Sequence, residues 1–316
     1  MRKTCLDMVY ELARKDERIY FIGSDLGVGT LKQFKAEMPE RFLMEGVSEA
    51  NVVGMAAGLA LEGKIVYVNT IATFLTRRCF EQVVLDLCLH KANVRLIANG
   101  GGVVYAPLGP THEAIEDIAI FRALPCMTIL AVADAEEMKR MMPETVNHPG
   151  PIYIRLGKGG DPVVTDPSVP FKIGKAIPMR EGSDALIVST GIMLKAALDA
   201  SAALAAAGLS AAVLHVPTVK PFNRETFLQL ARIVPVIFSV EEHSIIGGLG
   251  STVAEILAET EFDSPKRFRR LGLPDDFPDK YGSQASLLQR YDLTAEKIAA
   301  AVQTLAQGKA AAAVPA

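Results

Sequence analysis

Runs of apolar residues alternate with helix-like patterns through the first half of the chain. Stretches rich in β-branched residues predict strands at 19–23, 64–69, 94–99, 128–132 and 152–156. Apolar residues at helical spacing predict helices between them, at 49–62, 76–91, 114–122 and 135–147. Strands that are apolar along their whole length, separated by helices, indicate a parallel sheet covered on both faces. The first half is therefore predicted to be a doubly wound α/β domain.

A second α/β pattern follows a passage rich in proline and glycine, residues 157–178, which favours extended and turn conformations. Strands are predicted beyond it at 185–189, 211–216 and 236–240, and helices at 193–207, at 224–233 and from about Gly250. We predict a first domain at 1–165, a linker at 166–180, a second domain at 181–308 and a disordered tail at 309–316. The predicted fold class is α/β, with two doubly wound domains and mainly parallel sheets.

Composition excludes several classes of function. The chain has 316 residues, 50% of them hydrophobic and 22% charged, which is enough for two domains of about 150 residues each. A formal net charge of -3 gives no electrostatic case for binding nucleic acid or an acidic membrane surface. The apolar stretches are shorter than the roughly 20 residues that span a bilayer, and the first residues lack the apolar segment of a secretory signal. We expect a soluble, cytoplasmic protein.

The four cysteines form no Cys-x-x-Cys pair, so neither a zinc cage nor a redox motif is expected. Their apolar or helical surroundings predict buried free thiols at all four positions: Cys5, Cys79, Cys88 and Cys126.

Glu49 is the most informative single residue, because it opens a helix that is otherwise uncharged and built from small residues. Ser48 can cap this helix, and an acid suits the positive end of the helix dipole, so simple capping is one interpretation. The low side-chain bulk between Gly54 and Ala60 favours another, in which a flat ligand approaches the helix closely. The glycine-rich turn at 23–29, which contains Asp25, matches neither the dinucleotide fingerprint nor a P-loop.

The sequence around Glu49 carries a family resemblance. Gly-Val-Ser-Glu-Ala-Asn at 46–51, followed by Gly-Met-Ala-Ala-Gly-Leu-Ala at 54–60, resembles the pyrimidine-binding segment of transketolase-like, thiamine diphosphate-dependent enzymes. The likeness continues in order over nearly the whole chain, through 73–75, 81–82, 109–113, 116–117, 151–155, 241–243 and 247–250. It implies a pyrimidine-binding domain followed by a transketolase C-terminal-like domain. It also implies that Glu49 shares a proton with the aminopyrimidine ring of the cofactor, as a carboxyl in an apolar site can.

The resemblance implies roles for further residues near the cofactor. Phe74 or Phe80 is expected to pack against the pyrimidine ring, although helical spacing also allows Phe80 to be a core residue. Arg77 and Arg78 are candidates to bind a substrate phosphate, since arginine suits bidentate phosphate contacts; the alternative is that one of them is simply solvated. In the family, the turn equivalent to the one that contains Asp25 lies near the cofactor, so Asp25 is expected to contribute to the cofactor site.

Two more residues are expected to contact substrate. His112, in Gly-Pro-Thr-His-Glu at 109–113, matches the family's segment in which a histidine contacts the sugar and moves protons. Arg155, at the end of a predicted strand, resembles the arginine that holds the acceptor's phosphate, and a surface ion pair is the alternative. Leu108 departs from the family, which commonly has Asp before this glycine, so the donor sugar stays open.

The chain lacks the Gly-Asp-Gly segment followed by Asn with which the family holds Mg²⁺ and the diphosphate. The resemblance therefore implies a C-terminal transketolase subunit whose thiamine diphosphate and Mg²⁺ site is completed by a separate N-terminal subunit. The implied reaction moves a two-carbon ketol unit from a ketose phosphate to an aldose, and self-association into a dimer is expected. A 1-deoxyxylulose-5-phosphate synthase-like carboligase, a 2-oxo acid dehydrogenase beta subunit and a non-catalytic scaffold subunit are the alternatives.

Overall fold

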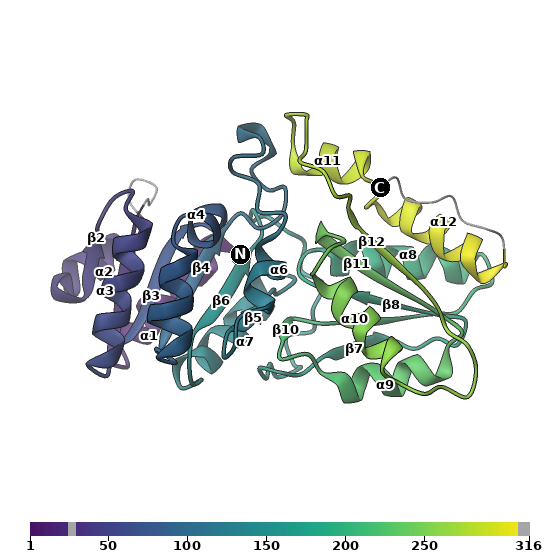
Figure 1. The fold of residues 1–316 in the computed structure, drawn as a ribbon, viewed down its shortest axis with the longest axis horizontal. Coiled ribbons are helices and arrows are strands. Elements are labelled where there is room, and N and C mark those ends of the chain that lie inside the picture. The colour runs from purple at the N-terminus through teal and green to yellow at the C-terminus, as the bar shows by residue number, and fades with distance from the viewer. Residues whose placement is uncertain (25–29, 309–316) are drawn as a thin grey trace.

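The computed structural model describes residues 1–24 and 30–308. Its first sheet has seven strands in the order β10-β5-β6-β4-β3-β1-β2 (Figure 1). The members are β1 Ile19–Gly23, β2 Phe42–Met44, β3 Ile65–Ile71, β4 Val94–Asn99, β5 Thr128–Leu130, β6 Ile152–Leu156 and β10 Thr218–Lys220. Strands β1 to β6 pair in parallel, and β10, from the second half of the chain, pairs antiparallel with β5.

Helices cover both faces of this sheet. One apolar cluster packs beneath α1 Arg2–Ala13, α2 Lys32–Glu37 and α7 Ala135–Val146. The other packs beneath α3 Glu49–Leu61, α4 Ala72–Arg77, the π-helix Val83–Leu89 and α6 Asp117–Arg122. The first sheet and its helices therefore form a three-layer unit. The carboxyl end of β3 leads into α4, and the carboxyl end of β4 leads into a loop.

The second sheet has five strands in the order β12-β11-β8-β9-β7. They are β7 Ile177–Arg180, β8 Ala185–Ser189, β9 Ala211–His215, β11 Val236–Ser244 and β12 Arg267–Leu273, all parallel to their neighbours except β7. Helices α8 Met193–Ala206 and α12 Ala295–Ala306 cover one face, α9 Arg224–Ile233 and α10 Leu249–Ala258 cover the other, and α11 Gln284–Arg290 lies beyond the sheet edge. Two mainly parallel, helix-covered sheets confirm the predicted fold class.

The elements differ from the prediction in several places, and the elements not predicted include α1, α12 and the strands β2, β7, β10 and β12. The single helix expected at 76–91 is broken after Arg77, and a short helix, α5 Phe80–Gln82, leads into the π-helix. The helix expected from residue 114 begins at Asp117, because Ala114 is bonded to Gly102 instead. The domain limits stay a prediction, and β10 joins the two halves by crossing into the first sheet.

The cysteine prediction is right for three residues and wrong for one. Cys5, Cys79 and Cys88 are buried free thiols, and burial raises their pKa values to about 12, 12 and 11. Cys126 is a free thiol too, but it is exposed, in a turn where its φ is +64°. Within residues 1–24 and 30–308, no helix is long and apolar enough to cross a bilayer.

Candidate functional site

Glu49 begins α3 and lies almost wholly inside the protein, with 3% of its surface exposed. Ser48 is the N-cap residue, but its hydroxyl donates to the Glu45 carbonyl at 3.0 Å, so the expected side-chain cap is absent. One carboxylate oxygen of Glu49 lies 3.5 Å from the Thr70 hydroxyl at the end of β3. The other lies 3.3 Å from Nη1 of Arg78. The carboxylate is thus buried with one charged partner.

Arg78 links Glu49 to an aromatic ring. Its guanidinium carbon lies 3.7 Å from the centroid of Phe74, while Nη1 faces Glu49. The His112 ring meets the same Phe74 ring edge-on, with the two centroids 5.3 Å apart at an interplanar angle of 64°. The structure therefore brings together four of the residues singled out from the sequence, from α3, α4 and the loop before α6: Glu49, Phe74, Arg78 and His112.

Arg77 lies next to this group but is taken up by the protein. It forms an ion pair with Glu116 at 2.5 Å and donates to the carbonyls of Pro110 at 3.1 Å and Glu113 at 2.9 Å. These contacts hold the chain on both sides of His112. Beside it, burial raises the pKa of the Glu113 carboxyl to about 7, although the Arg77 charge opposes the shift.

Arg155 lies at the contact between the two domains and is buried, with 7% of its surface exposed. Its Nε forms an ion pair with Asp117 at 2.7 Å, and its Nη2 donates to the carbonyls of Ala114 and Glu242. Tyr153 also donates to Asp117, at 2.7 Å. Burial alone would raise the pKa of Asp117, but the charge of Arg155 and these hydrogen bonds lower it. Nε and Nη2 of Arg155 are therefore taken up by protein partners in the interface, and its role as a phosphate ligand stays a prediction from the sequence.

The remaining predicted residues lie apart from the group around Glu49 or outside the description. Phe80 is 37% exposed and stacks on Phe121, with the ring centroids 6.4 Å apart. Asp25 falls outside the described residues. Among those that are described, no group of His, Cys, Asp and Glu could hold a metal ion.

Several buried polar atoms near the strand ends find no hydrogen-bond partner among the described residues: Asn69 Oδ1, Thr73 Oγ1, Asn99 Oδ1 and both carboxylate oxygens of Glu113. Unsatisfied buried groups are costly, so they favour a polar ligand or water at this edge. A buried carboxylate beside an aromatic face, with unpaired polar atoms nearby, fits a planar nitrogen heterocycle such as an aminopyrimidine.

A second set of buried polar side chains lies on β11, and the sequence did not reveal their partners. Glu241 accepts from the backbone N–H groups of Leu249 and Gly250 at the start of α10, and Glu242 accepts from Val103 N. Burial raises the pKa of Glu242 to about 7. Nε2 of His243 accepts from Ala119 N at 3.2 Å, which makes it an interface residue. The available signal was Glu-Glu-His inside an otherwise apolar strand, since such charges need buried partners.

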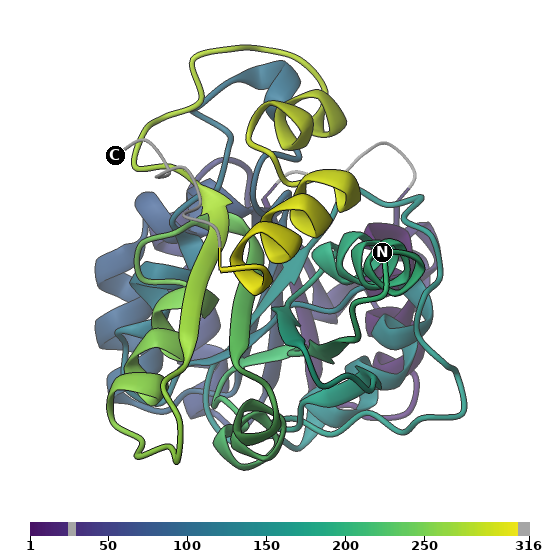
Figure 2. The same cartoon turned by 90° about the vertical axis from the view of Figure 1, so that its right-hand side faces the viewer.

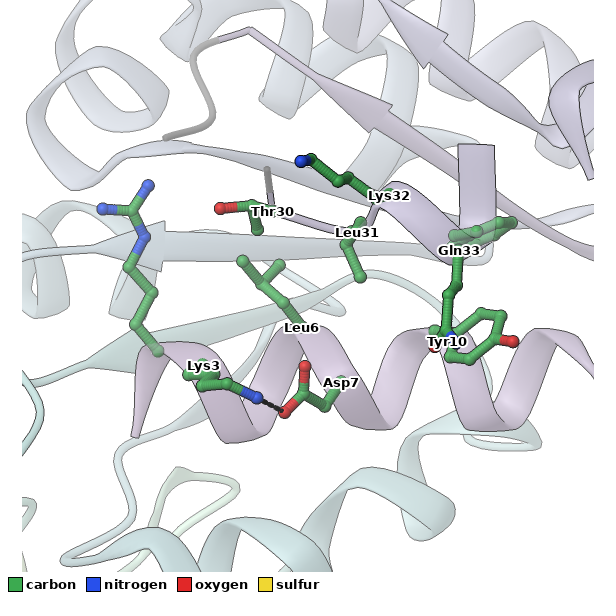
Figure 3. Close-up of a pocket in the computed structure, with 10 residues that line it drawn as sticks. Lys3, Leu6, Asp7, Tyr10, Thr30, Leu31, Lys32 and Gln33 are labelled. Carbon is green, nitrogen blue, oxygen red and sulfur yellow. Dashed lines mark hydrogen bonds and ion pairs between the residues drawn. The ribbon is translucent and has the colours of Figure 1, made fainter. Parts of the chain in front are cut away.

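A surface pocket of about 540 Å³ opens between α1 and the start of α2 (Figure 3). It is lined by Lys3, Asp7, Tyr10 and Lys32, among others, and Lys3 pairs with Asp7 at 2.5 Å. It lies on the α1 side of the sheet, whereas Glu49 lies on the α3 side. The pocket is therefore separate from the group around Glu49.

Family models match both halves of the chain. Residues 1–160 match the family described as transketolase, pyrimidine binding domain, and residues 174–298 match transketolase, C-terminal domain. A 6-deoxy-6-sulfo-D-fructose transketolase subunit from Clostridium sp. (strain MSTE9) is 37% identical over 98% of this chain and 95% of its own length. An apulose-4-phosphate transketolase subunit of Phocaeicola vulgatus is 36% identical over 94% of both chains.

A solved structure described as a split gene transketolase, inactive beta4 tetramer, superposes with a TM-score of 0.89. It is 37% identical in sequence and covers 98% of this chain and 99% of its own. The chain therefore belongs to the transketolase family, with the pyrimidine-binding and C-terminal domains in the arrangement of the split transketolase subunits that it resembles.

Proposed function

We propose that this chain acts in a transketolase-like enzyme that moves a two-carbon ketol unit from a ketose phosphate to an aldose, with thiamine diphosphate as cofactor. The observation that carries the proposal is the buried Glu49 carboxylate, joined through Arg78 to the face of Phe74, with His112 against the edge of the same ring. Family membership supports this class of cofactor. The cytoplasmic location and the dimer expected from the sequence remain part of the proposal.

The residues divide the work as follows. When bound, thiamine diphosphate supplies the nucleophilic carbon that accepts the two-carbon unit. Glu49 would hold a proton at a pyrimidine ring nitrogen, since its carboxylate is buried and its partner Arg78 lies over the face of Phe74. Phe74 would pack on the ring. His112 would donate a hydrogen bond to a sugar hydroxyl or accept one, and exchange protons with it. We retain Asp25 and Phe80 as sequence-based candidates for cofactor contacts.

Arg78 has to move before a ring can lie there. Its planar guanidinium occupies the face of Phe74 and pairs with Glu49, which are the two contacts that an aminopyrimidine would need. Its side chain is 47% exposed, so it has solvent to move into. Because Arg77 is bound to Glu116 and to backbone carbonyls, Arg78 is the better candidate of the two for a substrate's anionic group.

The diphosphate and Mg²⁺ would be held by an N-terminal transketolase subunit that completes the site. The relatives named above as subunits for a sulfonated fructose and for apulose 4-phosphate support both a partner and a substrate that carries an anionic group. Leu108, half-exposed at the end of a short 3-10 helix, stands where the family commonly has Asp, so donor preference is predicted to differ from that of common transketolases.

Calorimetry tests the proposal. Thiamine diphosphate with Mg²⁺ is titrated into the chain alone and into the chain purified with its partner subunit, each as wild type and Glu49→Gln. Exposed Glu45 serves as a matched control, Glu45→Gln, four residues earlier. Binding by the mixture, with turnover of D-xylulose 5-phosphate or D-fructose 6-phosphate lost only in Glu49→Gln, supports the proposal. Absence of binding by the wild-type mixture would refute it and favour a scaffold role.

A further inference from the structure

His112 lies on a segment that leaves the first sheet after β4 and returns before α6. We define the His112 segment as residues 103–113. It is closed at its base by two hydrogen bonds of 2.9 Å between Gly102 and Ala114, each residue donating its N–H to the other's carbonyl. Figures 1 and 2 both show this segment standing at the top of the molecule beside α11 of the second domain. The place of His112 therefore depends on what holds this segment.

Glu242, on β11 of the second domain, holds the base of the segment. Its Oε1 accepts from Val103 N at 3.0 Å and from Nε2 of Gln284 at 2.8 Å. Only 3% of Glu242 is exposed, so these bonds form in a site of low dielectric. A side chain at Gly102, where φ is +67°, would place its β-carbon 2.5 Å from the Glu242 carboxyl carbon, which is why glycine is needed there.

Arg155 joins the strand that carries Glu242 to the first domain. Nη2 of Arg155 donates both to Ala114 O at 3.2 Å and to Glu242 O at 2.9 Å. It thus links the returning end of the His112 segment to the strand that carries Glu242. Ser244 N, two residues further along β11, donates to Ile115 O at 2.8 Å.

The tip of the segment also meets the second domain. Tyr281, three residues before Gln284, packs on Gly109, where a β-carbon would come within 2.7 Å of its ring. Within the first domain, Arg77 donates to the carbonyls of Pro110 and Glu113. His112 is therefore held from α4 on one side and from the second domain on the other.

We propose that Glu242 and Gln284 are positioning residues for His112, which act through the His112 segment and make the second domain a working part of the catalytic site. The catalytic consequence rests on the proposed function, because it matters only if His112 contacts substrate. The positioning of His112 by Glu242 and Gln284 does not depend on the proposed function. Loss of either side chain frees Val103 N or Glu242 from its partner and lets His112 move away from the edge of Phe74.

The test compares Gln284→Ala and Glu242→Ala with Gln289→Ala, an exposed glutamine on the same helix. The full chain with its partner subunit is used throughout. The first readout is the imidazole proton resonance of His112, assigned with His112→Gln, because the nearby Phe74 ring shifts it. We expect the shift to be lost in Gln284→Ala and Glu242→Ala and kept in Gln289→Ala. Gln284 lies near the surface, so its variant keeps the test available if Glu242→Ala does not fold.

The second readout separates positioning from general damage. The affinity for thiamine diphosphate is expected to stay unchanged, since Glu49 and Phe74 are untouched, while kcat/KM for D-xylulose 5-phosphate falls on the order of tenfold to a hundredfold. An unmoved His112 resonance in both variants would overturn the inference. A resonance that moves, in an enzyme whose wild type binds no cofactor, would refute the proposed function and leave the positioning in place.

Discussion

Replacing Arg78 by Gln tests whether its guanidinium occupies the place of the cofactor ring. Two contacts hold this side chain, the 3.3 Å ion pair with Glu49 and the 3.7 Å approach to the Phe74 ring. At a half-exposed position, an ion pair contributes about 0.2 to 1 kcal/mol and a cation–π contact about 0.5 to 1 kcal/mol. Together the two contacts favour the arrangement in which Arg78 lies over Phe74 and pairs with Glu49, by about 1 to 2 kcal/mol.

A ligand that displaces Arg78 has to overcome this free energy. Its removal should tighten binding of thiamine diphosphate to the chain and its partner by about fivefold to thirtyfold. The same change leaves the Glu49 carboxylate buried without its charged partner, so the unliganded chain should lose stability. Tighter binding together with a lower midpoint of thermal unfolding is the signature we expect.

Calorimetry and thermal unfolding measure the two effects. Arg14→Gln is the matched control, because Arg14 also lies over an aromatic ring, Tyr10 at 5.8 Å, and near a carboxylate, Glu11 at 3.9 Å, but on the α1 side of the sheet. It should change neither affinity nor turnover. Unchanged or weaker cofactor binding in Arg78→Gln would refute the reasoning. Because Arg78 is also the proposed contact for the substrate's anionic group, a higher KM for the sugar phosphate is expected beside the tighter cofactor binding.

Two further predictions concern the domain interface. Arg155→Met leaves Asp117 buried without its charged partner, so the free energy of unfolding, measured in urea, should fall by about 3 to 5 kcal/mol. The control Arg224→Gln breaks an exposed ion pair with Glu259 and should lower it by about 1 kcal/mol or less. A similar small loss in both variants would contradict this difference. Glu242 has a pKa raised from 4.5 to about 7, so its neutral form is favoured in the folded state, and its contribution to stability is complete below pH 4.5 and lost as the pH rises through 7. The unfolding free energy of Glu242→Gln, relative to that of wild type, should therefore rise between pH 4.5 and pH 8, by up to about 3 kcal/mol in urea unfolding. If the difference between variant and wild type is the same at the two pH values, this prediction is wrong.

Local sequence patterns predicted most of the strands, because buried parallel strands are apolar along their whole length. Strands β1, β4, β6 and β8 have the predicted limits. Periodicity could not reveal the break after Arg77, where α4 ends and the π-helix follows, since such a shift changes backbone hydrogen bonds more than the spacing of apolar residues. The β12 strand was missed because its arginine-rich sequence is only half-buried.

The candidate site was predictable only in part, for a reason of sequence distance. Glu49 and Phe74 could be assigned from motifs that lie within short segments. The roles of Arg77 and Arg155 depend on Glu116 and Asp117, which are 39 and 38 residues away. The bonds of Glu242 span 139 residues to Val103 and 42 to Gln284. No local pattern reports such pairs, so the sequence alone could not show which partners hold the two arginines or that Glu242 lies in the interface.

The crossing of β10 into the first sheet bears on how the chain can be divided. Residues Thr218–Lys220 pair with β5, and Lys220 donates to the carbonyls of Arg122 and Leu124. A fragment that ends near residue 180 would keep β1 to β6 yet leave the outer edge of β5 bare, and bare strand edges recruit other chains. A chain that is cut at this boundary is therefore expected to aggregate. The two domains should accordingly be found together on one polypeptide.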